Sequence, residues 1–442
     1  MIPKSGWTSL SKAIVLVSGP DSTKLLNGLV TSRFLPAITK KNEYTVSTST
    51  TAKDSPQLET FNVTSNWGVI HEDIYQEPSD VWMSRNGINS MFLNSKGRVL
   101  WDCFIYPTPY TSTVTNTDES QYLIEVDPCF ESKLMSYLKI HKLGSKITIK
   151  KLDNVISNYY YNDDIENGFD DYLTALDETY GYNYTVSDSW KNAQLMKDKL
   201  FNPNVIHNGN LLGFAVDNRI PNFGLKFITT GSKEAAVTAD DDSESPSPFI
   251  FPANKINQQD ITQRRYINGL YECGDNPTVS LFPFEYNLDY INGLSLDKGC
   301  YIGQELTIRT YNNQLFRKRI MPGQFFDIIN GPPSQLSPSH VSLTVADDSL
   351  LPMNDIELET QAAAVEAEEA IGFQPSTNPF GGISKVVRKR KASPGKILSS
   401  RDNLAFALVS IGAIEKSKGI FQVKTDQGPK GFKVFTPDWW PQ

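Results

Sequence analysis

Short apolar runs separated by turn-forming residues characterise the first part of the chain. Residues 13–17 form a continuous apolar run of strand length, and residues 18–22 supply Gly, Pro, Asp and Ser, which end strands and cap helices. Apolar residues then recur at helical spacing from Leu25 to Val30. This opening predicts a strand followed by a short helix.

Strand-like and helical runs continue to alternate further along the chain. The strand-like runs occupy 91–93, 98–106, 122–126 and 147–152, and a helical stretch lies at 129–141. Helical periodicity fades after about Arg317, and short strand-like runs follow at 396–398, 404–411, 419–423 and 431–435. The pattern predicts a mixed α+β body followed by a small C-terminal β-barrel.

Four stretches contain few large apolar residues and are rich in polar ones: 40–65, 107–120, 232–256 and 331–380. We interpret them as surface insertions. Their composition cannot offset the entropy lost on ordering them, so we expect deletion of residues 334–370 to leave the melting temperature nearly unchanged.

Charge and hydropathy narrow the class of protein. The formal net charge is -8, whereas a protein with a large nucleic-acid binding surface normally needs that surface to be basic. We therefore expect no nucleic-acid partner. No run of about 18 apolar residues is present, so we expect no segment to span a bilayer.

The first 20 residues allow two interpretations. They contain Lys4, Lys12, several Ser and no Asp or Glu, which is the acid-poor composition of a segment that targets the mitochondrial matrix. They are equally consistent with a short tail followed by a core strand at 13–17.

The cysteines and histidines do not form a metal-binding pattern. The four cysteines are widely separated and form no C-x-x-C pair, and the four histidines lack the spacing of the common metallohydrolases. We therefore expect no permanently bound metal or cofactor and a reducing compartment.

Cys300 lies between a strand-like run at 294–296 and a helix entered through Gly303. The Lys298 ammonium and the helix N-terminus favour a thiolate, whereas Asp297 and Glu305 oppose it. The sequence does not decide between these effects. An isolated cysteine is most often a small buried apolar residue.

A second candidate site lies on the predicted hairpin 91–106, whose turn is Asn94-Ser95-Lys96-Gly97. Strand alternation places Leu100, Asp102 and Phe104 on one face. If that face is buried, the pKa of Asp102 is raised, which suits the carboxyl to hydrogen bonding or proton transfer with a heterocycle. The alternative is an exposed acid on an edge strand.

The segment K-G-C-Y-I-G-Q-E resembles the signature of the YgfZ-type relatives of the glycine-cleavage T-protein. Residues 282–289 and 317–320 match the same family, and weaker similarity extends over 19–21, 92–98, 217–219 and 395–399. The residues of the signature are Lys298, Gly299, Cys300, Tyr301, Ile302, Gly303, Gln304 and Glu305.

The resemblance implies an α+β fold in which residues 1–321 form a discontinuous two-lobe body of the folate-binding type. Residues 322–442 would then form the C-terminal β-barrel. It also implies an assembly factor that matures [4Fe-4S] proteins in the mitochondrial matrix together with A-type iron-sulfur carrier proteins. Cys300 would be the functional cysteine, either as a ligand to a transient cluster shared with a partner or as a reactive thiol.

The resemblance also implies a folate-like pocket. Asp102 matches the aspartate that the T-protein uses beside tetrahydrofolate, Arg219 and Arg265 could meet the glutamate tail, and Glu285 could supply a second carboxylate. All three residues other than Asp102 could equally form structural ion pairs. We expect Asp102, Arg265, Glu285 and the strand before Cys300 to border one central cavity.

One position departs from the T-protein pattern. Where that family has a glutamate that reads the pterin edge, this chain has Ile267, which would leave pterin donors unpaired at a cost of roughly 1–3 kcal/mol each. Aminomethyl transfer is therefore disfavoured. A folate-dependent one-carbon transferase and a non-catalytic adaptor stay open as alternatives.

Overall fold

The computed structural model describes residues 2–34, 69–72, 81–108, 120–181, 183, 186–206, 210–231, 246–296, 298–314, 316–337, 394–425 and 428–441. The chain divides into two compact units. The first comprises residues 1–261, 272–314 and 441–442, and the second comprises 262–271 and 315–440. The second unit thus begins a few residues before the predicted boundary at 321 and also takes in a segment from the middle of the chain.

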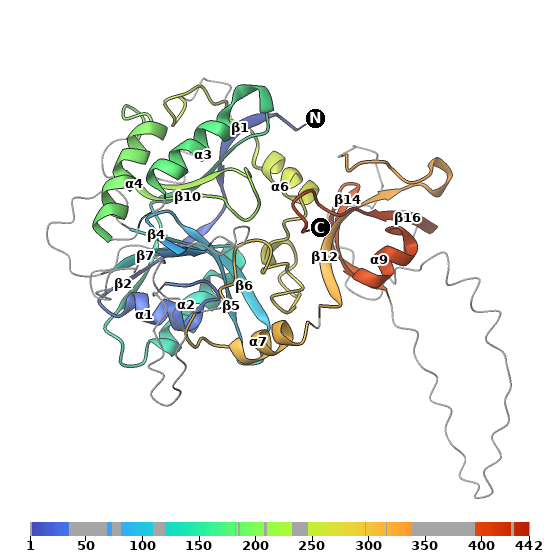
Figure 1. The fold of residues 1–442 in the computed structure, drawn as a ribbon, viewed down its shortest axis with the longest axis horizontal. Coiled ribbons are helices and arrows are strands. Elements are labelled where there is room, and N and C mark those ends of the chain that lie inside the picture. Colours follow the sequence, from blue (N-terminus) through green and yellow to red (C-terminus); the bar gives the residue numbers. More distant parts are fainter. Residues whose placement is uncertain are drawn as a thin grey trace, which may run out of the picture. The chain divides into compact units, whose positions relative to one another are not determined.

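One sheet of the first unit is antiparallel throughout. Its order is β1 (Ser5–Leu10), β9 (Val155–Asn162), β11 (Leu225–Thr230) and β10 (Leu211–Val216). Two helices, α3 (Phe169–Tyr180) and α4 (Val186–Leu200), cover this sheet, as Figure 1 shows. Their apolar stripes, which include Leu173, Met196 and Leu200, pack on Phe214 and Phe227 of the strands.

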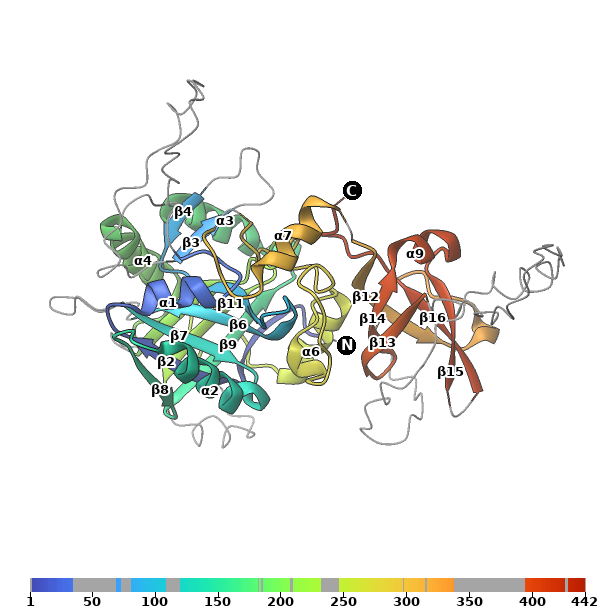
Figure 2. The same cartoon turned by 90° about the horizontal axis from the view of Figure 1, so that it is seen from below.

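The other large sheet of the first unit is also antiparallel. Its order is β5 (Ile88–Leu93), β6 (Val99–Pro107), β7 (Gln121–Val126), β2 (Ala13–Ser18) and β8 (Thr148–Leu152). The helices α1 (Ser22–Leu29) and α2 (Glu131–Lys142) contact this sheet (Figure 2). The ends of the strands and of the two helices that the sequence predicted in this region therefore differ from the observed ends by at most a few residues. A separate pair, β3 (Val69–Glu72) and β4 (Val81–Ser84), completes the strands of this unit.

The two large sheets share an apolar core to which both contribute. Phe104 and Tyr106 of β6 pack with Ala215 of β10 and Ile228 of β11. Gly213 permits this approach, because a Cβ at that position would lie 2.8 Å from Tyr106 Cβ. The face of β6 that carries Asp102 and Phe104 is thus turned toward the interior of the unit.

The N-terminal residues form strands. Residues 13–17 lie in β2, as the second of the two sequence interpretations expected. Residues 5–10, which that interpretation assigned to a tail, form β1 and pair with β9.

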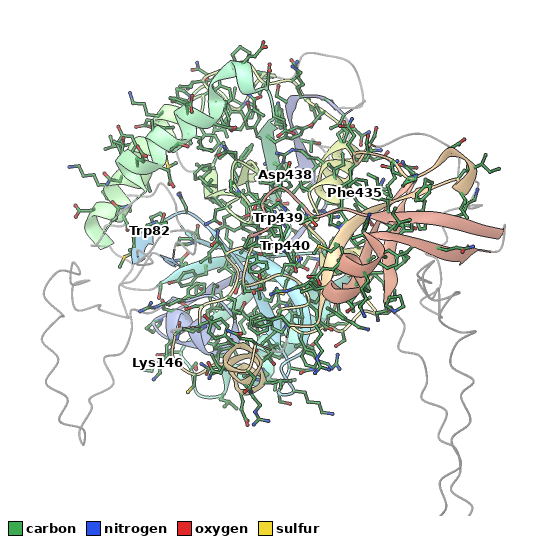
Figure 3. The ribbon with its side chains drawn as sticks, turned by 45° about the vertical axis from the view of Figure 1, so that its right-hand side comes forward. Trp82, Lys146, Phe435, Asp438, Trp439 and Trp440 are labelled. Atoms are coloured by element: carbon green, nitrogen blue, oxygen red, sulfur yellow. The ribbon has the colours of Figure 1, made fainter. Side chains whose placement is uncertain are left out.

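The second unit is built on a five-stranded antiparallel sheet. Its order is β13 (Gly395–Arg401), β14 (Leu404–Ser410), β12 (Lys318–Phe326), β16 (Gly428–Val434) and β15 (Ile420–Thr425), with α9 (Ile411–Ser417) between β14 and β15. Phe325, Phe421 and Phe432 belong to its core. The chain end from Phe435 to Trp440, labelled in Figure 3, follows β16, and Trp440 packs against this core.

Two further helices lie near the points where the chain passes from one unit to the other. Helix α6 (Gln258–Ile267) begins in the first unit and ends in the second, and α7 (Gln304–Asn312) is the last helix of the first unit. Short 3-10 turns lie at Pro128–Phe130, Ile165–Asn167, Cys273–Asp275 and Ile328–Asn330. Among the described residues, no helix is long and apolar enough to cross a bilayer.

Most of the predicted insertions lie outside the described residues. The exceptions include Ser337, whose backbone N–H donates to Gln324 Oε1 at 2.9 Å and whose carbonyl accepts from Asn403 Nδ2 at 3.0 Å. A deletion meant to spare the barrel should therefore begin after Ser337.

Candidate functional site

The signature segment lies along the end of α1 and the residues that follow it. The Lys298 ammonium donates to Val30 O at 2.6 Å and to Ser32 O at 2.7 Å. The backbone N–H of Ile302 donates to Gly28 O at 3.1 Å. Cys300 therefore sits at the midpoint of a short loop that is fixed on both sides.

Cys300 itself is exposed to solvent and forms no disulfide. The interpretation of this cysteine as a small buried apolar residue is therefore wrong. The strand expected at 294–296 is also wrong: the segment is not part of a sheet, although Ser295 donates its backbone N–H to Thr31 O at 3.0 Å.

Gly303 precedes helix α7, as the sequence predicted, and its backbone is left-handed. Its φ is 83°, and Gln304 is the first helical residue. The same glycine lies against the turn of the β5–β6 hairpin, where Gly97 has φ 72°. The signature segment and the hairpin lie far apart in the sequence, but they are in direct contact in the structure.

Lys298 has a structural task in this loop. Its side chain is buried, and its ammonium also lies 4.7 Å from the centre of the Tyr301 ring. Burial raises the pKa of the Tyr301 hydroxyl above its usual range. Glu305 is exposed and pairs with Arg309 one helical turn later at 2.9 Å. Asp297 lies outside the described residues.

Asp102 is half-buried on β6, and its environment favours the neutral acid. Burial raises the pKa of the carboxyl, and the Glu272 carboxylate raises it further. Lys12 and the backbone N–H of Cys273, which donates to Asp102 Oδ1 at 2.7 Å, oppose this rise. The expectation of a raised pKa for Asp102 agrees with this geometry.

Arg219 belongs to a buried ion-pair network beside Asp102. Its guanidinium binds Asp217 through two nitrogens at 2.8 and 2.7 Å and Glu272 through the third at 3.0 Å. Glu272 in turn pairs with Lys12 at 2.9 Å. Burial lowers the pKa of Lys12, but Glu272 and Asp102 outweigh it, so the pKa lies above its usual value. Arg219 thus forms ion pairs within the protein, and its contact with a folate tail stays a prediction.

Sequence reasoning missed a second buried pair deeper in the same region. Lys226 Nζ lies 2.6 Å from Glu125 Oε1, and both side chains are at most 3% exposed. Tyr106 and Ser157 donate their hydroxyls to Glu125 Oε2 at 2.9 Å each. The available signal in the sequence was one charged residue in each of the otherwise uncharged strands β7 and β11.

Glu285 and Arg265 each bind the backbone of their own segment. Glu285 accepts the backbone N–H of Phe282 at 2.8 Å and thereby stabilises its own turn. Arg265 lies in the second unit, where it donates to Leu270 O at 2.8 Å, and Ile267 ends helix α6 there. A cavity shared by Asp102, Arg265 and Glu285 stays a prediction.

The other cysteines differ from Cys300. Cys103 and Cys273 are buried, and burial raises the pKa of both thiols. Cys129 is exposed, but desolvation and the neighbouring Asp127 raise its pKa to about 12. Within the described parts of the chain, no group of three or more His, Cys, Asp and Glu side chains could hold a metal ion.

The fold is that of the glycine-cleavage aminomethyltransferases. The structure superimposes on aminomethyltransferase T of the glycine cleavage system from Bartonella henselae with a TM-score of 0.50, at 8% identity, over 99% of this chain and 86% of that one. Residues 317–442 match the family model of the CAF17 C-terminal β-barrel domain. The predicted T-protein-like α+β fold with a C-terminal barrel is confirmed.

Full-length relatives define the family more narrowly. The chain is 42% identical to the mitochondrial iron-sulfur cluster assembly factor IBA57 homolog of Meyerozyma guilliermondii, over 100% of both chains. It is also 42% identical to the Candida albicans homolog over 99% of both chains, and 31% identical to IBA57 of Saccharomyces cerevisiae over 89% of this chain and 79% of that one. The chain belongs to the IBA57 family of iron-sulfur cluster assembly factors.

Proposed function

We propose that this protein is an assembly factor that matures [4Fe-4S] proteins in the mitochondrial matrix, and that Cys300 is its working residue. The observation that carries the proposal is the exposed Cys300 thiol on a loop fixed by Lys298 and Ile302. Family membership supports the general role, since the relatives bear the name of mitochondrial iron-sulfur cluster assembly factors.

The chemistry suits a shared cluster. A thiolate is a soft ligand that binds iron well, and the sulfur of Cys300 is accessible from solvent. A cluster is usually held by four ligands, and one thiolate supplies one of them. The remaining ligands would come from an A-type carrier, so the cluster passes through the complex as cargo.

A fixed loop has an advantage for such a transfer. The Lys298 and Ile302 tethers hold the backbone on either side of Cys300, so little conformational entropy is lost when the thiol meets the cluster. The contact of Gly303 with the hairpin turn holds the same loop from its C-terminal side.

The test is reconstitution of the purified full-length protein with an A-type carrier, ferrous iron and sulfide without oxygen. We expect a complex that co-elutes and has the visible absorption of a cluster. Cys300→Ser should abolish the absorption, whereas Cys129→Ser, which changes another exposed cysteine, should retain it. If Cys300→Ser keeps the wild-type absorption, Cys300 is not a cluster ligand, and a non-catalytic adaptor is favoured.

Folate-dependent one-carbon transfer is the second candidate, and Asp102 is the observation in its favour. Its half-buried carboxyl with a raised pKa is able to donate a proton to a heterocycle. The other residues fit less well, because Arg219 is fully paired with carboxylates and Ile267 replaces the pterin-reading glutamate.

Tetrahydrofolate binding tests this second candidate directly. Binding to the wild type, Asp102→Asn and Ile267→Glu would be measured by fluorescence titration, and transferase activity by a separate assay. The candidate is supported if the wild type binds, Asp102→Asn binds more weakly and Ile267→Glu gains transferase activity. Absence of binding in all three would remove it.

A further inference from the structure

One of the segments that the structure describes is strongly basic, although the protein as a whole is acidic. Residues 132–152 contain six lysines and no Asp or Glu, whereas the whole chain has 50 acidic and 42 basic residues. The segment covers α2, the turn after it and β8. Its local field is therefore opposite in sign to the net charge of the protein.

Helix α2 carries three of these lysines, of which Lys133 and Lys139 are exposed and Lys142 is half-buried, and protruding aliphatic side chains lie near its C-terminal end. The helix buries Leu134 and Leu138, and it contacts β2 and β8 (Figure 2). At its far end Ile140 is 68% exposed and Leu143 is 88% exposed. We call the group formed by Lys139, Ile140, Lys142, Leu143 and Lys146 the α2 tip.

The α2 tip has a defined backbone. Leu143 has φ 44°, a conformation that costs free energy in any residue with a Cβ, yet its side chain gains no burial from it. The turn is closed by the Ser145 N–H, which donates to Lys142 O at 2.8 Å, and by the Lys146 N–H, which donates to Asp21 Oδ2 at 2.7 Å. Lys146 itself is exposed and is labelled in Figure 3.

The charged groups around the tip leave its lysines available. Glu131 and Asp153 both pair with Lys151, at 3.0 and 3.5 Å. Asp21 accepts the Lys146 backbone N–H, and His141 is bound through Nδ1 to Tyr137 O at 2.8 Å. Among the described residues, no ion pair engages Lys139, Lys142 or Lys146.

We propose that the α2 tip binds the surface of a bilayer that contains anionic lipids. Ile140 and Leu143 would enter the boundary between headgroups and acyl chains, and the three lysines would lie near lipid phosphates. An acidic protein is the less favoured partner. Protein interfaces are depleted in lysine and enriched in aromatic residues and arginine, and neither kind is exposed in the tip.

The test is flotation of the full-length protein with vesicles of phosphatidylcholine alone or mixed with phosphatidylglycerol. We expect binding only to the mixed vesicles. The triple variant Lys139→Gln, Lys142→Gln, Lys146→Gln should lower the partition coefficient about 100-fold, because each lysine contributes roughly fivefold. The double variant Ile140→Ser, Leu143→Ser should lower it by about tenfold or more.

Matched controls come from exposed residues of the second unit. Ile329→Ser removes an isoleucine that is 98% exposed, and Lys416→Gln with Lys418→Gln removes two exposed lysines. Both controls should float as the wild type does, and all variants should keep the wild-type unfolding midpoint.

Two results would overturn the proposal. The first is failure of the wild type to float with the anionic vesicles. The second is unchanged flotation of Ile140→Ser, Leu143→Ser, with binding to soluble polyglutamate that depends on the three lysines. That combination would indicate an acidic protein partner.

Discussion

Gly97 and Gly303 lie against each other with left-handed backbones. A Cβ on Gly303 would lie 2.5 Å from Asn94 O and 3.1 Å from Gly97 Cα, and a Cβ on Gly97 would lie 3.0 Å from Gly303 O. The hairpin turn and the Cys300 loop can therefore approach this closely only because both residues lack a side chain.

This contact predicts a strong effect of Gly303→Val on stability and on cluster assembly. The left-handed φ costs about 1 kcal/mol or more for a residue with a Cβ, and the clash with the Asn94 carbonyl adds to that. We expect the midpoint of thermal unfolding to fall by several degrees. Gly299→Ala is the control, since its Cβ would meet nothing within 4 Å. Equal midpoints for both variants would contradict the contact.

Cys300→Ser should separate function from folding. The side chain is exposed, and exposed substitutions usually change the free energy of unfolding by less than about 0.5 kcal/mol. We expect an unchanged unfolding midpoint together with a loss of aconitase activity in mitochondria of cells that carry only this variant. Cys129→Ser serves as the control. If Cys300→Ser cells keep wild-type aconitase activity, Cys300 is not the working residue.

Lys298→Met tests the tether without touching the thiol. Methionine nearly preserves the volume of the side chain but leaves Val30 O and Ser32 O without this donor, at roughly 1–3 kcal/mol for each carbonyl. We expect lower stability and weaker cluster formation, while Cys300 still reacts with a thiol reagent. Lys96→Met, at an exposed position in the hairpin turn, should behave as the wild type. A stable Lys298→Met protein would show that the tether is dispensable.

Asp102→Asn should change how stability depends on pH. The folded state raises the pKa of Asp102 above its ordinary value of 3.8, so over the interval between the two values the folded state binds more protons than the unfolded state. The contribution of Asp102 to the free energy of unfolding is therefore greatest below the pKa of the unfolded state, and it decreases as pH rises through the pKa of the folded state. Asparagine does not titrate, so its contribution does not change with pH in this way.

Denaturant unfolding of Asp102→Asn and wild type measures this difference. The variant should gain stability relative to wild type as pH rises above the ordinary pKa of the aspartate carboxyl. Asp153→Asn, which changes a side chain that is 74% exposed, is the control for the loss of one carboxyl group. A difference for Asp102→Asn that stays constant or falls with pH would mean that the carboxyl is ionised in the folded protein.

Local features of the site followed from the sequence. The glycine entry at Gly303, the helix that starts at Gln304 and the hairpin around residues 94–97 each depend on a few neighbouring residues, whose backbone preferences are encoded locally. The eight-residue signature was likewise sufficient to identify the family and the fold, because a contiguous motif can be read without knowing any distant contact.

The tertiary structure decided which residues meet. Lys298 looked like an activator of the neighbouring thiol, but its ammonium binds carbonyls 268 and 266 positions away. The sequence suggested that Arg219 binds a ligand, yet its guanidinium also donates a hydrogen bond to Glu272, 53 positions away. Burial of charge requires such partners, and they are set by the packing of distant strands and loops. The same packing left Cys300 exposed, which local sequence cannot specify because exposure depends on what the rest of the chain covers.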